Sequence, residues 1–166
     1  MYRSTFLVRI LVMGEDEVLI MVRDITDRKQ AEAALRIAEE NYRSIFENAL
    51  EGIFQSSPEG RFLKVNPALA KIYGYDSPTE MIESITDIAS QLYVDPEKRV
   101  EFRALLETNS SVKDFEYRCY CKDGGIIWTQ VDARKVINSD GELLYYEGIV
   151  QDITERKRRE DELRQQ

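Results

Sequence analysis

Cys119 and Cys121, in the stretch "RCYC", are the only thiols in this sequence of 166 residues. On a strand, residues two positions apart point to the same side, an arrangement that does not readily close a disulfide. We therefore interpret both as reduced thiols. The sequence contains no histidine, so a nucleophile would have no imidazole base and a metal or haem would have no imidazole ligand.

Carboxylates and phenols are the other groups that could do chemistry, with 31 Asp and Glu residues and nine Tyr. The sequence places no two carboxylates in one enclosed site, as general acid–base catalysis requires. It also lacks a phosphate-binding loop of the Walker type. We expect no catalysis and no metal site in this chain, and we keep an enzyme of α+β fold only as the last alternative.

Composition limits the classes of protein further. A content of 43% hydrophobic and 33% charged residues is typical of one soluble globular domain with appended segments. The net charge of −8 argues against a nucleic-acid partner, which would need a basic surface. No apolar stretch approaches the roughly 18 residues of a membrane span, and no signal peptide is recognisable. We therefore expect a cytoplasmic protein that does not insert into a membrane.

A six-residue motif occurs twice, as "DITDRK" at Asp24–Lys29 and as "DITERK" at Asp152–Lys157. Each copy follows strand-forming residues and begins a segment rich in helix formers, so each marks a strand-to-helix junction. The copies lie about one domain length apart, a spacing typical of tandem domains. We expect residues 1–23 to be the strand hairpin that ends a preceding domain; the alternative is a hairpin that packs on this chain's own sheet.

Residues 24–46 are expected to form a linker helix. Its apolar positions repeat in alternating steps of four and three, which is a heptad pattern. The positions are Ala31, Leu35, Ala38, Tyr42, Ile45 and Ala49. The pattern fits a weak coiled coil with a second chain, and it equally fits one amphipathic helix lying on its own domain.

The remaining chain alternates strand and helix signals in blocks. Two short strands flank "PEG", several short helical segments follow, and three longer strands separated by "KDGG" and "NSDGE" end the domain. Asn66 and Asp95, each followed by Pro, are expected to cap two of the helices. Strands segregated from helices predict an α+β fold with an antiparallel sheet.

Three stretches carry a family resemblance. "GIFQSSPEGRFLKVNPALAKIYGYDS", "FEYRCYCKDGGIIW" and "GIVQDITERK" together resemble a PAS domain with its C-terminal S-box, or PAC-type, motif, the sensory module of bacterial multidomain signalling proteins. The resemblance implies a five-stranded antiparallel sheet of order 2-1-5-4-3, short helices on one face and flanking linker helices. It assigns residues 47–154 to the PAS domain and 155–166 to the start of an output helix. "VLIMVRDITDRKQAE" resembles the end of a preceding PAS domain.

A PAS pocket lies between the inner sheet face and the short helices. Strand alternation puts Phe115, Tyr117, Cys119 and Cys121 on one face, with Thr129, Val131 and Leu144 among the inward residues of the next strands. The pocket candidates are Phe54, Ser56, Ile72, Tyr73, Tyr117, Cys119, Thr129, Val131, Tyr146 and Val150. They fit an ordinary packed core. The inward hydroxyl of Thr129, however, needs a hydrogen-bond partner, which the backbone, a water or a bound molecule would supply.

The cofactors of the family have no matching residues here. Light-sensing members carry a reactive cysteine in an "NCRFLQ"-like helix, whereas both cysteines of this chain lie on a strand. Haem-binding members mostly use histidine, which is absent. We expect no cofactor, and an unidentified small metabolite remains the alternative ligand.

The resemblance implies a sensory or relay module that works as a homodimer. Its helices would transmit a conformational signal to an output domain of the same full-length protein, such as a histidine kinase or nucleotide cyclase. Thr154 is expected to cap the outgoing helix and Ile153 to insert into the edge of the core. Asp152 is expected to hold a neighbouring donor or to pair with a nearby Arg or Lys. The candidate junction residues are Asp24, Thr26, Asp152, Ile153 and Thr154. The candidate residues for dimer or linker-helix contacts are Trp128, Leu35, Tyr42 and Ile45.

Overall fold

A computed structural model describes residues 3–166 and divides the chain into two compact units, residues 1–45 and 46–166. The first two residues, which belong to the hairpin expected at 1–23, lie outside the described part. Among the residues described, no helix is both long enough and apolar enough to cross a membrane.

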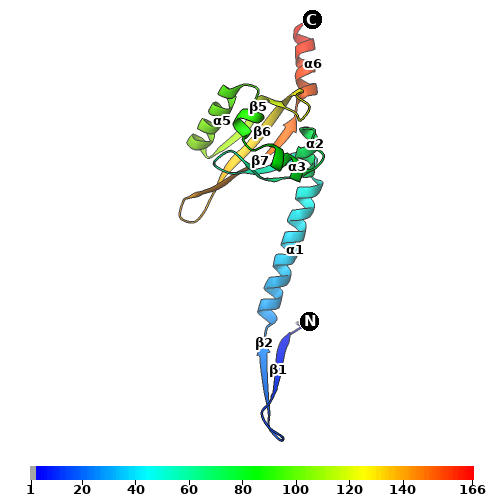
Figure 1. The fold of residues 1–166 in the computed structure, drawn as a ribbon, viewed down its shortest axis with the longest axis vertical. Coiled ribbons are helices and arrows are strands. Elements are labelled where there is room, and N and C mark those ends of the chain that lie inside the picture. Colours follow the sequence, from blue (N-terminus) through cyan, green and yellow to red (C-terminus); the bar gives the residue numbers. More distant parts are fainter. Residues whose placement is uncertain (1–2) are drawn as a thin grey trace. The chain divides into compact units, whose positions relative to one another are not determined.

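The first unit contains a two-stranded hairpin and most of a long helix. Strands β1 (Phe6–Val12) and β2 (Val18–Asp24) pair antiparallel in an unbroken register, and α1 covers Thr26–Asn48 (Figure 1). Both strands are exposed on both faces, so the hairpin has no core of its own within the described chain.

The second unit is built on one antiparallel sheet of five strands. They are β3 (Gly52–Ser56), β4 (Phe62–Val65), β5 (Ser111–Tyr120), β6 (Ile126–Ile137) and β7 (Leu143–Asp152). Their order in space is β4-β3-β7-β6-β5. This arrangement confirms the expected α+β fold and the order 2-1-5-4-3.

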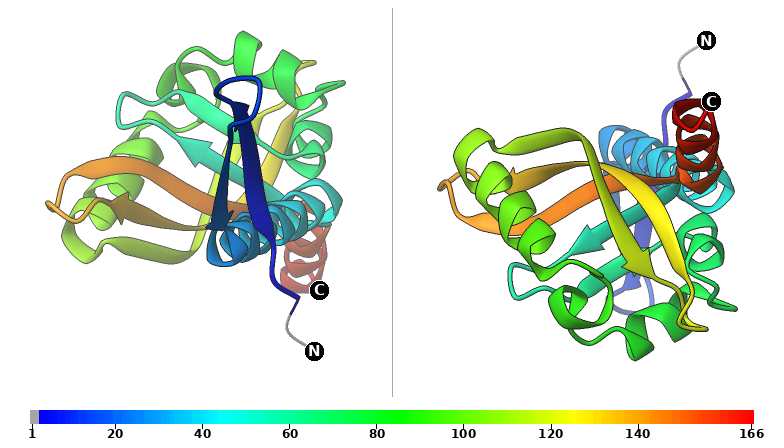
Figure 2. Two further views of the ribbon diagram at one scale, coloured as in Figure 1. Left: turned by 90° about the horizontal axis from the view of Figure 1, so that it is seen from below. Right: turned by 90° about the horizontal axis from the view of Figure 1, so that it is seen from above.

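Four short helices cover the inner face of this sheet, and a fifth follows its last strand. The first four are α2 (Pro67–Ile72), α3 (Pro78–Ser84), α4 (Ile88–Gln91) and α5 (Pro96–Asn109), and the last is α6 (Thr154–Arg164) (Figure 2). The core between helices and sheet is apolar and aromatic, and the fully buried Leu69 and Met81 lie in it.

Asn66 is a buried polar residue that ties three segments together. Its side-chain oxygen accepts hydrogen bonds from the amides of Leu69 (3.0 Å) and Ile53 (2.8 Å), so it caps α2 as expected and also binds β3. Its amide nitrogen donates to the carbonyls of Phe46 and Glu51, 3.0 Å from each. With all its polar atoms paired, full burial of this amide is tolerated.

Two local expectations were wrong. Asp95 precedes α5 but makes no side-chain cap, because its carboxylate instead binds Arg118 on β5 through two hydrogen bonds of 2.8 and 3.1 Å. Leu144 was expected to face inward, but it is exposed and Leu143 packs against the core. A bulge between Val136 and Ile137 shifts the β6–β7 register there and reverses which neighbour points inward.

Candidate functional site

The candidate site is a small cavity between the sheet and α2, α4 and α5. Its walls are lined by Phe54, Ser56, Phe62, Leu69, Tyr73, Ile88, Leu92, Tyr93, Arg99, Phe102, Tyr117, Val131 and Val150. The centres of water-sized molecules can occupy only about 20 Å³ of it. That space holds about one water molecule. A flavin or haem does not fit between these walls.

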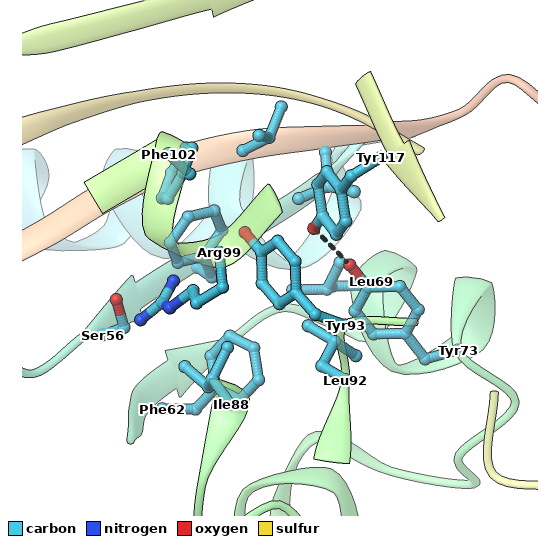
Figure 3. A pocket seen from close by; sticks show the side chains of 13 residues that line it. Ser56, Phe62, Leu69, Tyr73, Ile88, Leu92, Tyr93, Arg99, Phe102 and Tyr117 are labelled. Carbon is cyan, nitrogen blue, oxygen red and sulfur yellow. Dashed lines mark hydrogen bonds between the residues drawn. The ribbon is translucent and has the colours of Figure 1, made fainter. Parts of the chain in front are cut away.

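Three tyrosines form the polar part of the interior (Figure 3). The hydroxyls of Tyr73 and Tyr117 are hydrogen-bonded at 3.3 Å, and the ring of Tyr93 stacks on that of Tyr117 with centroids 4.5 Å apart and planes 13° from parallel. Burial raises the pKa of Tyr93 to about 12 and the pKa values of Tyr73 and Tyr117 well above their ordinary value. All three are therefore neutral at physiological pH.

Cys119 and Thr129 face each other from neighbouring strands beside these tyrosines. Cys119 Sγ lies 3.5 Å from Thr129 Oγ1, and the Thr129 hydroxyl donates to the Tyr117 carbonyl at 3.3 Å. Burial raises the pKa of the Cys119 thiol to about 12, so it is protonated. Among the described residues, every buried side-chain nitrogen and oxygen has a hydrogen-bond partner. These polar groups therefore do not need a ligand to complete their hydrogen bonds.

Arg99 on α5 is the one cation in the cavity wall. The centre of its guanidinium lies 5.5 Å from the ring centre of Tyr93 and 5.8 Å from that of Phe102. Figure 3 shows the guanidinium pointing toward the hydroxyl of Ser56. Arg99 is half-buried, so the cavity wall combines an aromatic interior with one positive charge.

The structure divides the ten pocket candidates into two groups. Six line the cavity: Phe54, Ser56, Tyr73, Tyr117, Val131 and Val150. The other four do not line it but lie in or against the core: Ile72, Cys119, Thr129 and Tyr146. No sequence pattern indicated Tyr93, Arg99 or Phe102 as wall residues, although Pro96 signalled the start of the helix that carries Arg99 and Phe102.

Tyr146 belongs to a separate polar cluster that holds α5 on the sheet. Its hydroxyl donates to Glu107 Oε1 at 2.8 Å, and Lys135 Nζ lies 3.2 Å from Glu107 Oε2. The guanidinium of Arg103 lies 5.0 Å from the centre of the Tyr146 ring. These contacts link α5 to β6 and β7, so the helix that carries Arg99 has its own attachment to the sheet.

The exit from the sheet into α6 is the second feature of interest. Asp152 Oδ1 accepts hydrogen bonds from the amide and hydroxyl of Thr154, at 2.9 and 2.6 Å. The Thr154 hydroxyl in turn accepts from the Trp128 amide at 3.0 Å, and Ile153 is buried with its amide bonded to the Trp128 carbonyl at 2.9 Å. The expectations for Asp152 and Ile153 agree with this geometry. The expected cap by Thr154 is wrong, because Thr154 is the first residue of α6 and its hydroxyl binds β6.

Charged side chains fix the first turn of α6 to the outer face of the sheet. Glu116 on β5 pairs with Arg156, whose Nη2 lies 2.6 Å from Oε1, and with Lys157. Lys157 Nζ also lies 5.2 Å from the centre of the Trp128 ring. Trp128, expected to contact a linker helix or a second subunit, is thus half-buried beneath α6 of this chain.

The first junction repeats the second in its hydrogen bonds. Asp24 Oδ1 accepts from the amide and hydroxyl of Thr26, at 2.9 and 2.5 Å, and the Thr26 hydroxyl accepts from the Thr5 amide at 2.9 Å. On α1, the candidate contact residues Leu35, Tyr42 and Ile45 have exposed fractions of 61%, 50% and 69%.

Comparison with known protein families and sequences identifies relatives of this chain. A family model described as a PAS domain matches residues 50–155, well over half of the chain. The sensor histidine kinase TmoS of Ectopseudomonas mendocina is 27% identical over 92% of this chain, and sporulation kinase C of Bacillus subtilis is 30% identical over 77%. This chain spans 16% of the length of the first relative and 29% of the second. A probable diguanylate cyclase, DgcE of Escherichia coli, is 27% identical over 74% of the chain, which spans 11% of it.

Solved structures share the fold. The PAS domain of a protein from Colwellia psychrerythraea superposes with a TM-score of 0.62 at 22% identity, covering 72% of this chain and 98% of that domain. A domain of a sensory box histidine kinase/response regulator from Geobacter sulfurreducens gives a TM-score of 0.55 at 27% identity, covering 71% and 96%.

Proposed function

This chain belongs to the PAS domain family, and we propose that it is a sensory relay module that controls a kinase or nucleotide cyclase domain elsewhere in the full-length protein. The observation that carries the proposal is the set of hydrogen bonds from Trp128 on β6 to Ile153 and Thr154 at the start of α6. Any shift of β6 relative to its neighbours must be followed by the first turn of α6.

The core and the exit are adjacent on the same strand. Thr129 faces inward to Cys119 and to the carbonyl of Tyr117, while the neighbouring Trp128 carries the bonds to α6. A rearrangement of the buried tyrosines that displaces Thr129 would therefore also displace the neighbouring Trp128, and with it the start of α6. A small free-energy difference between two arrangements of β6 is enough for upstream strain to shift their populations.

The small volume of the cavity favours a relay over a sensor of small molecules, which is the second candidate. One observation supports the second candidate: Arg99 and Ser56 place a cation and a hydroxyl at the cavity, where they fit an anionic group. Binding of a larger molecule requires the cavity walls to move apart, since the space holds about one water. Native mass spectrometry with an absorption spectrum of the purified protein separates the two, because a sensor should retain bound mass and a relay should not.

We propose that the module works as a homodimer through α1. The heptad residues Leu35 and Ile45 are largely exposed, which is expected for a helix that pairs with a second helix through these positions. Leu35→Asp should lower the mass measured by light scattering from dimer to monomer, whereas Arg36→Asp on the neighbouring position should not. An unchanged dimer in Leu35→Asp contradicts a dimer seam on α1.

Asp152→Ala tests the relay in the full-length protein. Loss of a side-chain acceptor at a helix start costs about 0.5–2 kcal/mol, so the domain should stay folded with a melting temperature lower by a few degrees. The output activity should no longer respond to its stimulus. Asp140→Ala, in the exposed turn before β7, is the control and should signal normally. Normal signalling by Asp152→Ala refutes the proposed route.

A further inference from the structure

The N-terminal hairpin exposes an unusual amount of apolar surface. Val8, Ile10 and Val12 on β1, and Ile20 and Val22 on β2, are between 53% and 75% exposed. A hairpin of two strands is marginally stable alone in water, and contiguous apolar surface of this kind marks a place where something binds. The second unit of the same chain shows what kind of segment would bind this surface.

The hairpin reproduces the hydrogen bonds that join the last two strands of the complete domain to the helix after them. Thr5 takes the place of Trp128: its amide binds the hydroxyl of Thr26 at 2.9 Å, and its carbonyl accepts from the amide of Ile25 at 3.0 Å. The matching distances at Trp128 are 3.0 and 2.9 Å. Ile25 is buried, as its counterpart Ile153 is.

The strand registers agree with this correspondence. Phe6 pairs with Asp24 as Thr129 pairs with Asp152, and Val8 pairs with Val22 as Val131 pairs with Val150. Strands β1 and β2 therefore correspond to β6 and β7. In the complete domain β6 has β5 on its other side, whereas within the described residues β1 pairs with β2 alone.

The basic residues after the two junctions differ in what they bind. Arg156 and Lys157 reach Glu116 on β5, which stands opposite Gln130 in the register. Their counterparts Arg28 and Lys29 find, among the described residues, one carboxylate on their own helix, Glu32, at 3.6 Å from each. The first junction thus keeps both cations, while among the described residues no strand beside β1 carries a matching anion.

We propose that the free edge of β1, together with Arg28 and Lys29, is a docking site for one antiparallel strand that carries a carboxylate opposite Leu7. Leu7 is the counterpart of Gln130, so this carboxylate corresponds to Glu116. Residues on either side of it are apolar and lie on the face of Phe6 and Val8, as Phe115 and Tyr117 lie opposite Val131 and Thr129.

The occupant is a strand of the same full-length polypeptide that precedes the hairpin, as β5 precedes β6. The relatives TmoS and sporulation kinase C are several times longer than this chain, so such polypeptide is available in proteins of this kind. A second copy of the hairpin does not meet the requirement. Its strand β1, "FLVRILV", carries no carboxylate, and the one carboxylate of β2, Asp24, follows Arg23 and already binds Thr26.

A graft of this chain's own β5 tests the site in the full chain. Residues 111–125, which end just before Ile126, replace residues 1–2, so that the graft meets Arg3 as β5 and its turn meet Ile126. Amide exchange of residues 6–12 is measured by mass spectrometry under reducing conditions. The alternate amides of β1 that face its free edge should exchange at least tenfold more slowly than in the ungrafted chain.

Charge reversal makes the test specific. Glu116→Lys within the graft should abolish the protection, and combining it with Arg28→Glu and Lys29→Glu should restore it. The fluorescence of Trp128 reports that the second unit remains folded in every variant. Equal protection by the Glu and Lys grafts, or none by either, overturns the proposal. Protection of β1 in the ungrafted chain that rises with protein concentration also overturns it, because a second copy would then be the occupant.

Discussion

Glu116→Gln should release the first turn of α6 from the sheet while leaving the fold intact. The carboxylate contacts both Arg156 and Lys157, and the exposed fractions of the three side chains are 29%, 47% and 24%. Exposed ion pairs contribute about 0.2–1 kcal/mol, and hydrogen bonds to charged groups with less solvent about 1.5–3 kcal/mol. These partly screened contacts lie between the two ranges, at about 1–2 kcal/mol in total. The docking equilibrium of α6 should therefore fall roughly 5- to 30-fold.

Trp128 is the only tryptophan in the chain, and Lys157 lies over its ring, so its fluorescence reports this docking directly. Glu116→Gln should shift the emission to longer wavelength and increase quenching by acrylamide. Hydrogen bonds from Lys157 and Arg156 hold the pKa of Glu116 below its usual value of about 4.3. The stabilisation is therefore present above that pH and is lost as the pH falls through the lowered pKa. The wild-type emission should approach that of the variant under acid conditions.

Glu147→Gln is the matched control. Glu147 pairs with Arg134 on the same sheet, at 2.6 Å, and neither residue belongs to α6. Its loss should leave the Trp128 emission unchanged. The reasoning is refuted if Glu116→Gln has no effect on emission or quenching, or if Glu147→Gln has as large an effect.

Three further predictions concern the core. Leu69→Ala should lower the free energy of unfolding in urea by about 2–5 kcal/mol, because Leu69 is fully buried beside the cavity and its loss enlarges that space. Unfolding free energies measured from pH 8 to 11 should fall as the pH rises, since Tyr93 and Cys119 stay protonated in the folded state with pKa values of about 12 and ionise earlier when unfolded. Each contributes up to roughly 1.4 kcal/mol per pH unit once the pH exceeds its unfolded pKa, which is about 8.5 for Cys119 and about 10 for Tyr93, so Tyr93→Phe should flatten the decline only above about pH 10. Gly148→Ala should destabilise by at least about 1–3 kcal/mol in the same assay, because its Cβ would lie 2.3 Å from the Asp132 carbonyl oxygen.

The sidedness of the strands and part of the cavity were predictable because strands obey a fixed period, whereas the order of the strands was implied by the family resemblance. Alternation along β5 and β6 placed Tyr117, Thr129 and Val131 on the inner face without any knowledge of the helices. The same rule failed at Leu144, where a bulge reverses the alternation. Tyr93 and Arg99 escaped prediction because they come from the short irregular segment around α4 and α5, where no period is established.

The sequence by itself determined the features that depend on neighbours in the chain. The junction motif, the helix start at Asn66 and the sidedness of most strand positions follow from local hydrogen bonding and from the pleat. Only the tertiary structure decided that the cavity has room for about one water, because that volume is a small difference between the large volumes of side chains from distant segments. The tertiary structure also decided that Glu116 pairs with Arg156 and Lys157, about forty residues later in the chain. This pairing depends on where the last strand of the sheet ends and α6 begins.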